Sequence, residues 1–176
     1  PSEIVTLSLA GTTREGQMHS SYVIQTPIGT LTLLGNDQAL REIRFDDGRA
    51  KPDDGQVASD VLEQAAVQLT EYFDGKRSDF DLPIELTGSS FQKKVWSELR
   101  NIPYGHTISY GELAKRVGNP RAARAVGSAN ARNPIPIIVP CHRVIGANGS
   151  LVGFGGGLPT KRYLLGMESG EQISES

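Results

Sequence analysis

The chain of 176 residues contains one cysteine, Cys141. A single cysteine excludes an internal disulfide framework and a zinc site built from several cysteines, and it favours a reducing compartment. The sequence also lacks an apolar run long enough to span a bilayer, and it shows no basic-then-apolar leader. We therefore expect a soluble, cytoplasmic protein that binds no metal ion and contacts no membrane.

The net charge is only −2 at pH 7, but the charged residues are unevenly distributed along the chain. Residues 1–87 carry seven Lys and Arg against fifteen Asp and Glu, whereas residues 88–168 carry eleven against three. This asymmetry predicts two domains, of which the second faces a polyanion. A solvated basic face with no partner is the alternative.

Short apolar runs between turn signals predict three antiparallel strands between residues 20 and 45, followed by a helix that Ser59 caps and that runs to about Phe73. Residues 46–58 are acidic and rich in Gly and Pro, which indicates a loop, and residues 76–87 make a plausible linker. The predicted segments are a tail at 1–19, an α/β scaffold domain at 20–87, a mostly helical domain at 88–170 and a tail at 171–176.

Start and stop signals predict several short helices in the second half. Ser89 or Ser90 can cap the first of them. Residues 109–112 (SYGE) have the spacing of a capping box, and Gly118 closes the helix that they open. Residues 119–120 (NP) then begin another helix, with proline at its favoured first position. Two short helices joined by such a turn form a candidate helix-turn-helix.

The second of these helices consists almost entirely of small residues and arginines. Small side chains let a backbone approach another surface closely, and Arg121, Arg124 and Arg132 supply positive charge. That surface is either another helix or a DNA groove, where arginines contact the phosphates.

Residues 134–145 (PIPIIVPCHRVI) contain the single cysteine. Three prolines fix φ and remove backbone donors, so we expect a rigid extended passage rather than a helix or an inner strand. Cys141 then has His142 as a neighbouring base and Arg143 as a nearby cation, which suits a nucleophilic thiol of lowered pKa. A buried cysteine that acts only as a small hydrophobic residue is the alternative.

A glycine-rich stretch follows at residues 152–157 (VGFGGG). Its backbone can approach a planar ligand closely and present N–H groups to it. A phosphate-binding loop is the rival interpretation, but the Lys-Ser/Thr pair of such loops does not follow.

Taken together, these residues resemble the O6-alkylguanine-DNA alkyltransferases, also called methylated-DNA–protein-cysteine methyltransferases. The resemblance covers residues 88–168 with order and spacing kept, and Pro-Cys-His-Arg-Val at 140–144 is highly specific. The other matching stretches are 91–96, 108–110, 123–127, 133–134, 152–157 and 161–168. The resemblance implies an α+β fold. A small ribonuclease-H-like domain with a three-stranded antiparallel sheet and a helix would precede a mostly helical domain with a helix-turn-helix.

The resemblance also implies a reaction, in which Cys141 accepts the alkyl group of O6-alkylguanine once per molecule and without a cofactor. His142, joined to the thiol by a water, would activate it, and Glu168 would orient His142. Tyr110 would donate a proton toward N3 of the leaving guanine. Asn133 would hydrogen-bond between the helix-turn-helix and the active-site turn. Activity on O4-alkylthymine stays open.

By the same resemblance, residues 88–170 bind double-stranded DNA through the minor groove with the damaged nucleotide flipped out, and Arg124 fills the vacated stack. The protein would act as a monomer, with cooperative assembly on DNA left open. The residues assigned to DNA contacts are Arg121, Ala122, Ala123, Arg124, Arg132 and Ser109. The residues assigned to the base pocket are Pro136, Val144, Ile145, Val152, Phe154, Gly155 and Gly156.

Two rival functions stay open at the level of sequence. A thiol hydrolase that uses Cys141 and His142 predicts repeated turnover on acyl substrates. A helix-turn-helix damage sensor with a vestigial pocket predicts DNA affinity without alkyl uptake. In addition, Gly155 and Phe154 stand where some family members have serine and tyrosine, which leaves the response to bulky free-base inhibitors open.

Overall fold

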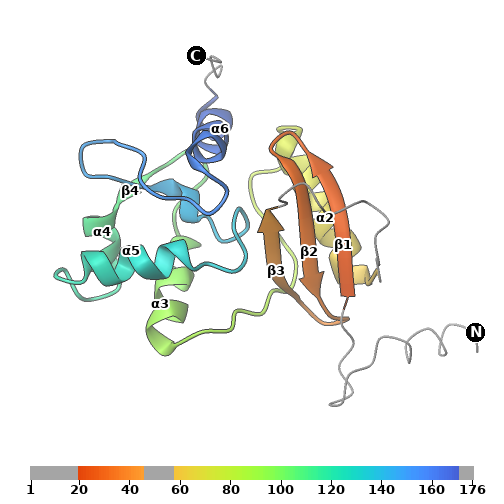
Figure 1. Ribbon diagram of the computed structural model, residues 1–176, viewed down its shortest axis with the longest axis horizontal. Helices are drawn as coiled ribbons and strands as arrows, with labels where there is room; N and C mark the ends of the chain where they lie inside the picture. Colours follow the sequence, from red (N-terminus) through yellow and green to blue (C-terminus); the bar gives the residue numbers. More distant parts are fainter. Residues whose placement is uncertain (1–19, 46–57, 171–176) are drawn as a thin grey trace, which may run out of the picture. The chain divides into compact units, whose positions relative to one another are not determined.

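In a computed structural model of the protein, residues 20–45 and 58–170 are described (Figure 1). The chain forms two compact units that divide between Glu85 and Leu86. The predicted tails at 1–19 and 171–176 lie outside the described residues, as do residues 46–57 of the predicted loop. No described helix is both long and apolar enough to cross a membrane.

The first unit is a three-stranded antiparallel sheet with a helix packed against it (Figure 1). Its elements in chain order are β1 (Ser20–Thr26), β2 (Gly29–Gly35), β3 (Leu40–Phe45) and α2 (Asp60–Phe73). Because side chains alternate across a strand, Leu31 and Leu33 share one face of the sheet, and Leu62 and Leu69 of α2 complete the same core. All four side chains are fully buried. The predicted sheet and helix are confirmed.

Helix α2 begins where the sequence predicts, because the Ser59 hydroxyl accepts a hydrogen bond from a backbone N–H of the first turn. Residues 76–87, by contrast, are not the free linker that their composition indicates. The Leu40 N–H donates to the Pro83 carbonyl at 3.0 Å, and the Leu40 carbonyl accepts from the Glu85 N–H at 2.9 Å. These bonds satisfy backbone groups of β3 that an edge strand would otherwise leave unpaired.

The second unit is mostly helical (Figure 1). Its elements are α3 (Ser90–Leu99), β4 (Ile108–Ser109), α4 (Tyr110–Arg116), α5 (Ala123–Ala131), the 3₁₀ helix η1 (Cys141–Arg143), β5 (Val144–Ile145) and α6 (Leu158–Ser169). Trp96 of α3 is buried, and its indole N–H donates to the Ala129 carbonyl at 2.8 Å, which joins α3 to α5. Parallel pairing of β4 with β5 brings the start of α4 beside the strand that follows Cys141.

The helix caps agree with the sequence patterns at α3 and only in part at α4. Ser89 and Gln92 form a complete capping box, with bonds of 3.1 and 2.9 Å between side chain and backbone in both directions. At α4 the Ser109 hydroxyl accepts from the Glu112 N–H at 3.0 Å. The Glu112 carboxylate instead pairs with Arg116 at 3.1 Å, so the reciprocal half of the predicted box is not formed.

Helix α5 begins later than the sequence predicts. The Asn119 side chain accepts a hydrogen bond from the Arg121 N–H, and its carbonyl accepts one from the Ala122 N–H, at 3.2 and 3.0 Å. Asparagine competes in this way with helical backbone bonds, and a turn forms. Pro120 therefore lies outside the helix, whose N-cap is Ala122.

Replacement of Leu69 by alanine is expected to lower the free energy of unfolding by about 2–5 kcal/mol, because it leaves a cavity in the core. The matched control is Val67→Ala on the same helix, where the side chain is 58 % exposed, against 0 % for Leu69. The control should change stability by no more than about 0.5 kcal/mol. Urea denaturation followed by circular dichroism measures both, and equal losses would contradict this description of the core.

Candidate active site

The chain reaches Cys141 through tight turns and not through the extended passage that its prolines suggest. The Ile138 N–H donates to the Pro136 carbonyl at 2.9 Å around Ile137, whose φ is 75°. The Cys141 N–H donates to the Val139 carbonyl at 2.8 Å around the residue between them. Both are γ-turns, since the bond spans two residues. Proline fixes φ at a value that suits turns as well as extended chain. The prediction of an extended passage is therefore wrong.

Two asparagines hold these turns in place. The Asn133 amide N–H donates to the Val139 carbonyl at 2.7 Å, and its side-chain oxygen accepts from the Ile135 N–H at 2.9 Å. The Asn130 amide N–H donates to the Cys141 carbonyl at 3.3 Å. The sequence predicts a role for Asn133 but not for Asn130. The spacing of apolar residues could have indicated that Asn130 is buried. It follows Val126 by four positions and so lies on the buried face of α5.

A buried carboxylate joins the two residues that follow the cysteine. Glu168 Oε2 lies 2.7 Å from His142 Nε2, and the Arg143 guanidinium donates to the two Glu168 oxygens at 2.7 and 3.0 Å. Arg143 also donates to the Ile102 carbonyl at 2.7 Å and lies over the Tyr104 ring at 5.7 Å. The structure thus brings the predicted pair His142 and Glu168 together. It also gives Arg143 a bidentate partner that the sequence does not reveal.

The charges of this cluster determine which atom of His142 carries the proton. Burial alone would raise the pKa of Glu168, but hydrogen bonds from His142 and Arg143 lower it to about 2, so the carboxylate is ionised. Burial lowers the pKa of His142 despite the contact with Glu168, so the imidazole is neutral. An ionised carboxylate only accepts, hence His142 Nε2 carries the hydrogen and Nδ1 is an acceptor. Nδ1 is buried and has no hydrogen-bond partner among the described residues.

The thiol of Cys141 has a raised pKa, in contrast to the lowered pKa that its neighbours suggest. Burial raises the pKa to about 11, and the hydrogen bond to Asn133 and the charge of Lys161 lower it only in part. Cys141 is therefore a neutral thiol at pH 7. Since the thiolate is the nucleophile, this cysteine reacts only when a base removes its proton.

Lys161 of α6 is buried completely, with bonds of 2.7 and 2.9 Å from its ammonium to the Val144 and Val152 carbonyls. Its ammonium lies 6.0 Å from the centre of the Tyr110 ring, and the Tyr110 hydroxyl donates to the same Val152 carbonyl at 3.1 Å. Burial lowers the pKa of Lys161, and the negative charge of a Cys141 thiolate raises it. Lys161 thus joins β5, the glycine loop and the surroundings of the thiol.

Lys161 is not among the predicted site residues, although the sequence contains a signal for its burial. It lies three positions before the buried Leu164 and seven before Glu168, which is the spacing of one helix face. Two charged residues on the apolar face of a helix indicate buried partners.

The residues predicted to form the base pocket come from the chain segments before and after Cys141. Val144 and Ile145 form β5, where they pair with residues 108 and 109, and Val144 is fully buried. Pro136 is buried in the turn before the cysteine. The remaining four belong to the glycine loop, in which Val152 and Gly155 are exposed and Phe154 and Gly156 are half-buried. The contacts of the Val152 carbonyl anchor the start of this loop.

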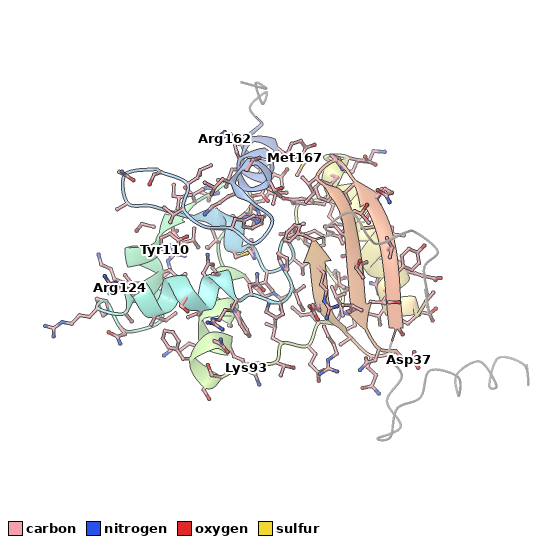
Figure 2. All side chains as sticks on the ribbon, in the orientation of Figure 1. Asp37, Lys93, Tyr110, Arg124, Arg162 and Met167 are labelled. Atoms are coloured by element: carbon pink, nitrogen blue, oxygen red, sulfur yellow. The ribbon has the colours of Figure 1, made fainter. Side chains whose placement is uncertain are left out.

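The residues predicted to contact DNA gather at the two ends of α5. Arg124 is exposed, and Figure 2 shows its side chain extending outward from the start of the helix. Ala122 and Ala123 are half-buried at the same end, Arg121 is exposed in the preceding turn, and Arg132 is exposed at the C-cap. Ser109 lies apart from them as the N-cap of α4. Among the described residues, no group of three or more His, Cys, Asp or Glu could hold a metal ion.

Comparison with known proteins identifies one family over both units. Residues 19–86 match the model of the 6-O-methylguanine DNA methyltransferase, ribonuclease-like domain, and residues 90–170 match that of the 6-O-methylguanine DNA methyltransferase, DNA binding domain. A methylated-DNA–protein-cysteine methyltransferase of Methanosarcina acetivorans is 48% identical over 149 residues, which cover 83% of this chain and 96% of that protein. One of Mycolicibacterium paratuberculosis is 50% identical over 147 residues, covering 82% and 89%.

Solved structures agree with these matches. The crystal structure of Mycobacterium tuberculosis O6-methylguanine methyltransferase is similar with a TM-score of 0.79 at 45% identity, covering 90% of this chain and 97% of that one. The structure of Mycobacterium tuberculosis OGT in complex with DNA has a TM-score of 0.78 at 47% identity, covering 85% and 92%. The predicted α+β fold with a ribonuclease-like first domain is confirmed.

Replacement of Glu168 by glutamine is expected to lower the melting temperature at pH 7, because Arg143 then lacks its charged partner. Breaking a buried pair in this way costs about 3–5 kcal/mol. The pKa of Glu168 is about 2 against an ordinary 4.5, so its contribution to stability is present above about pH 4.5 and is lost as the pH falls toward 2. The variant should therefore lose less stability than the wild type on acidification.

Differential scanning calorimetry from pH 7 to pH 3 measures this difference. The matched control is Glu112→Gln, which removes the exposed pair with Arg116 and should change stability by less than about 1 kcal/mol. Parallel curves for wild type and Glu168→Gln would rule out a buried, ionised Glu168.

Proposed function

Because this chain belongs to the 6-O-methylguanine DNA methyltransferase family, we propose that its single cysteine, Cys141, is the acceptor of the alkyl group. The protein is a methylated-DNA–protein-cysteine methyltransferase, which repairs alkylated DNA by moving the alkyl group to a cysteine of its own chain. One observation carries the assignment of Cys141. The one cysteine in the sequence is buried directly before the His142–Glu168–Arg143 cluster.

The first step in the proposed mechanism is deprotonation of the thiol. Since the pKa of Cys141 is about 11, the thiol needs a base, and His142 Nδ1 is the acceptor on the neighbouring residue. A water that joins the two groups would carry the proton, as the resemblance to the family implies. The resulting imidazolium donates to the ionised Glu168 through Nε2, which stabilises its charge. Lys161 and the Asn133 amide stabilise the thiolate.

The second step is displacement at the alkyl carbon. A bond forms between Cys141 Sγ and this carbon, the bond between the carbon and O6 breaks, and its electron pair passes to the guanine. The Tyr110 hydroxyl then gives its proton to N3 of the leaving base, which is general-acid catalysis. This requires Tyr110 to exchange its present acceptor, the Val152 carbonyl, for the base.

The reaction ends after one turnover. The product is a thioether at Cys141, which has no good leaving group, and the chain has no second cysteine to remove the alkyl group. Each molecule therefore transfers one alkyl group and is then inactive, and no step needs a cofactor.

We further propose that α5 enters the minor groove of double-stranded DNA with the damaged nucleotide flipped out. The small Ala122 and Ala123 permit a close approach, and the exposed Arg124 can fill the vacated place in the stack. Arg121 and Arg132 would contact phosphates. Action as a monomer in the cytoplasm is part of the same proposal, and cooperative assembly on DNA is left for direct measurement.

Incubation with duplex DNA that contains O6-methylguanine is expected to add one methyl group per chain, mapped to Cys141 by intact-mass and peptide mass spectrometry. Cys141→Ala should take up no methyl group and should still bind the damaged duplex. Methyl uptake by that variant would move the acceptor elsewhere. Tight binding without uptake by the wild type would favour a damage sensor, and repeated turnover of an acyl substrate would favour a thiol hydrolase.

Replacement of Arg124 by alanine is expected to slow alkyl transfer from duplex DNA at least about 10-fold, because unstacking a base costs a few kcal/mol that the inserted side chain offsets. Transfer from a free O6-alkylguanine base should change little. The matched control is Arg162→Ala, an exposed arginine on α6 (Figure 2). Single-turnover rates measure both reactions, and equal losses on duplex and free base would remove the role of Arg124 in base flipping.

A further inference from the structure

Asn130 is a buried amide near the nucleophile whose hydrogen-bonding capacity is not fully used. Its side chain lies on the inner face of α5 and is 4 % exposed. The side-chain oxygen has no hydrogen-bond partner among the described residues. A buried polar group left without a partner costs about 1–3 kcal/mol, so an apolar residue would serve the core better. Stability alone therefore does not account for asparagine at this position.

The Asn130 amide contacts the backbone of Cys141 and lies on the helix face that the Tyr110 ring approaches. Its N–H donates to the Cys141 carbonyl at 3.3 Å. One helical turn earlier on the same face is Gly127, and a Cβ atom there would lie 3.7 Å from the Tyr110 ring. The ring of Tyr110 therefore lies along α5 on the face that carries Asn130.

The hydrogen-bond donors of Tyr110 and Asn130 determine which bond can form between their side chains. The Tyr110 hydroxyl donates its only proton to the Val152 carbonyl at 3.1 Å, so its oxygen is left as an acceptor. The amide nitrogen of Asn130 has two N–H groups, of which one faces the Cys141 carbonyl. Burial and the charge of Cys141 raise the pKa of Tyr110, while hydrogen bonding by the Asn130 side chain lowers it. The second N–H is thus available as a donor to the phenolic oxygen.

We propose that Asn130 is a positioning residue for the proton donor, which holds the phenolic oxygen of Tyr110 and stabilises the charge that it acquires. The inference rests on the function proposed above. When the proton of the hydroxyl passes to N3 of the departing guanine, the electron pair of the O–H bond stays on Tyr110 as a phenolate. The amide N–H of Asn130 then donates to an anion, and such bonds are stronger than those to a neutral oxygen.

A double-mutant cycle tests this role by comparing Asn130→Leu in two backgrounds, the wild type and Tyr110→Phe. Leucine has nearly the shape of asparagine but no donor. With Tyr110 present, the maximal single-turnover rate on O6-methylguanine duplex should fall about 10- to 100-fold, the range for a hydrogen bond to a charged group. In the Tyr110→Phe background the same substitution should change the rate by less than about 3-fold, because no phenolate forms.

The measurement is methyl uptake by mass spectrometry, followed from seconds to days. This range covers the loss of about 10²- to 10⁴-fold that removal of a general acid causes. The half-saturating DNA concentration should stay unchanged, because Asn130 acts on the chemical step. Asn130→Ala, a substitution favoured in helices, provides a second cycle if the leucine variant does not fold.

Equal rate losses in the two backgrounds would overturn the inference and leave Asn130 with a structural role. The proposed function would then still stand, because the wild type takes up its methyl group in the same experiment. A wild type that takes up no methyl group would instead overturn the proposed function, and the role of Asn130 with it.

Discussion

The second unit depends on one buried carboxylate. Glu168 lies in the last turn of α6, where the helix dipole disfavours a negative charge, and its side chain is withdrawn from water. Both penalties are offset because Arg143 forms a bidentate ion pair with the carboxylate and His142 donates a hydrogen bond to it. Arg143 also binds the Ile102 carbonyl, so the end of α6, η1 and the segment after α3 are held together. The imidazole of the residue that follows Cys141 is therefore fixed in orientation and in tautomer.

The burial that surrounds this network also keeps the Cys141 thiol protonated at rest. Cys141 is a neutral thiol because charge is poorly solvated where it lies, and the nearby Lys161 and Asn133 offset this only in part. In the proposed mechanism its reactivity thus depends on a proton transfer to His142 and not on a permanently lowered pKa. Since each transfer consumes the protein, a thiol that is protonated at rest loses fewer molecules to other electrophiles.

Helix α5 combines two tasks in nine residues. Its first turn carries the exposed Arg124 and the small residues suited to close approach. Its last turn carries Asn130, which is bonded to the carbonyl of the nucleophile. Asn133, just beyond the helix, holds the turn that leads to Cys141. In the proposed complex, the position of α5 on DNA is therefore linked by hydrogen bonds of 3.3 and 2.7 Å to the backbone at and before Cys141.

The sequence by itself determined the strands, most helix limits and the one candidate for the acceptor cysteine, because these follow from local patterns and composition. Alternating apolar residues define a sheet face, Ser59 and Ser89 cap helices through bonds to residues three positions away, and a chain with one cysteine has one candidate acceptor. Only the tertiary structure decided the turns before Cys141, the protonation states and the partners of Arg143 and Lys161. The turns rest on an asparagine six positions before Val139 as well as on proline geometry. The protonation states depend on burial, and the partners of Arg143 and Lys161 lie 9 to 41 positions away, so no local pattern encodes them.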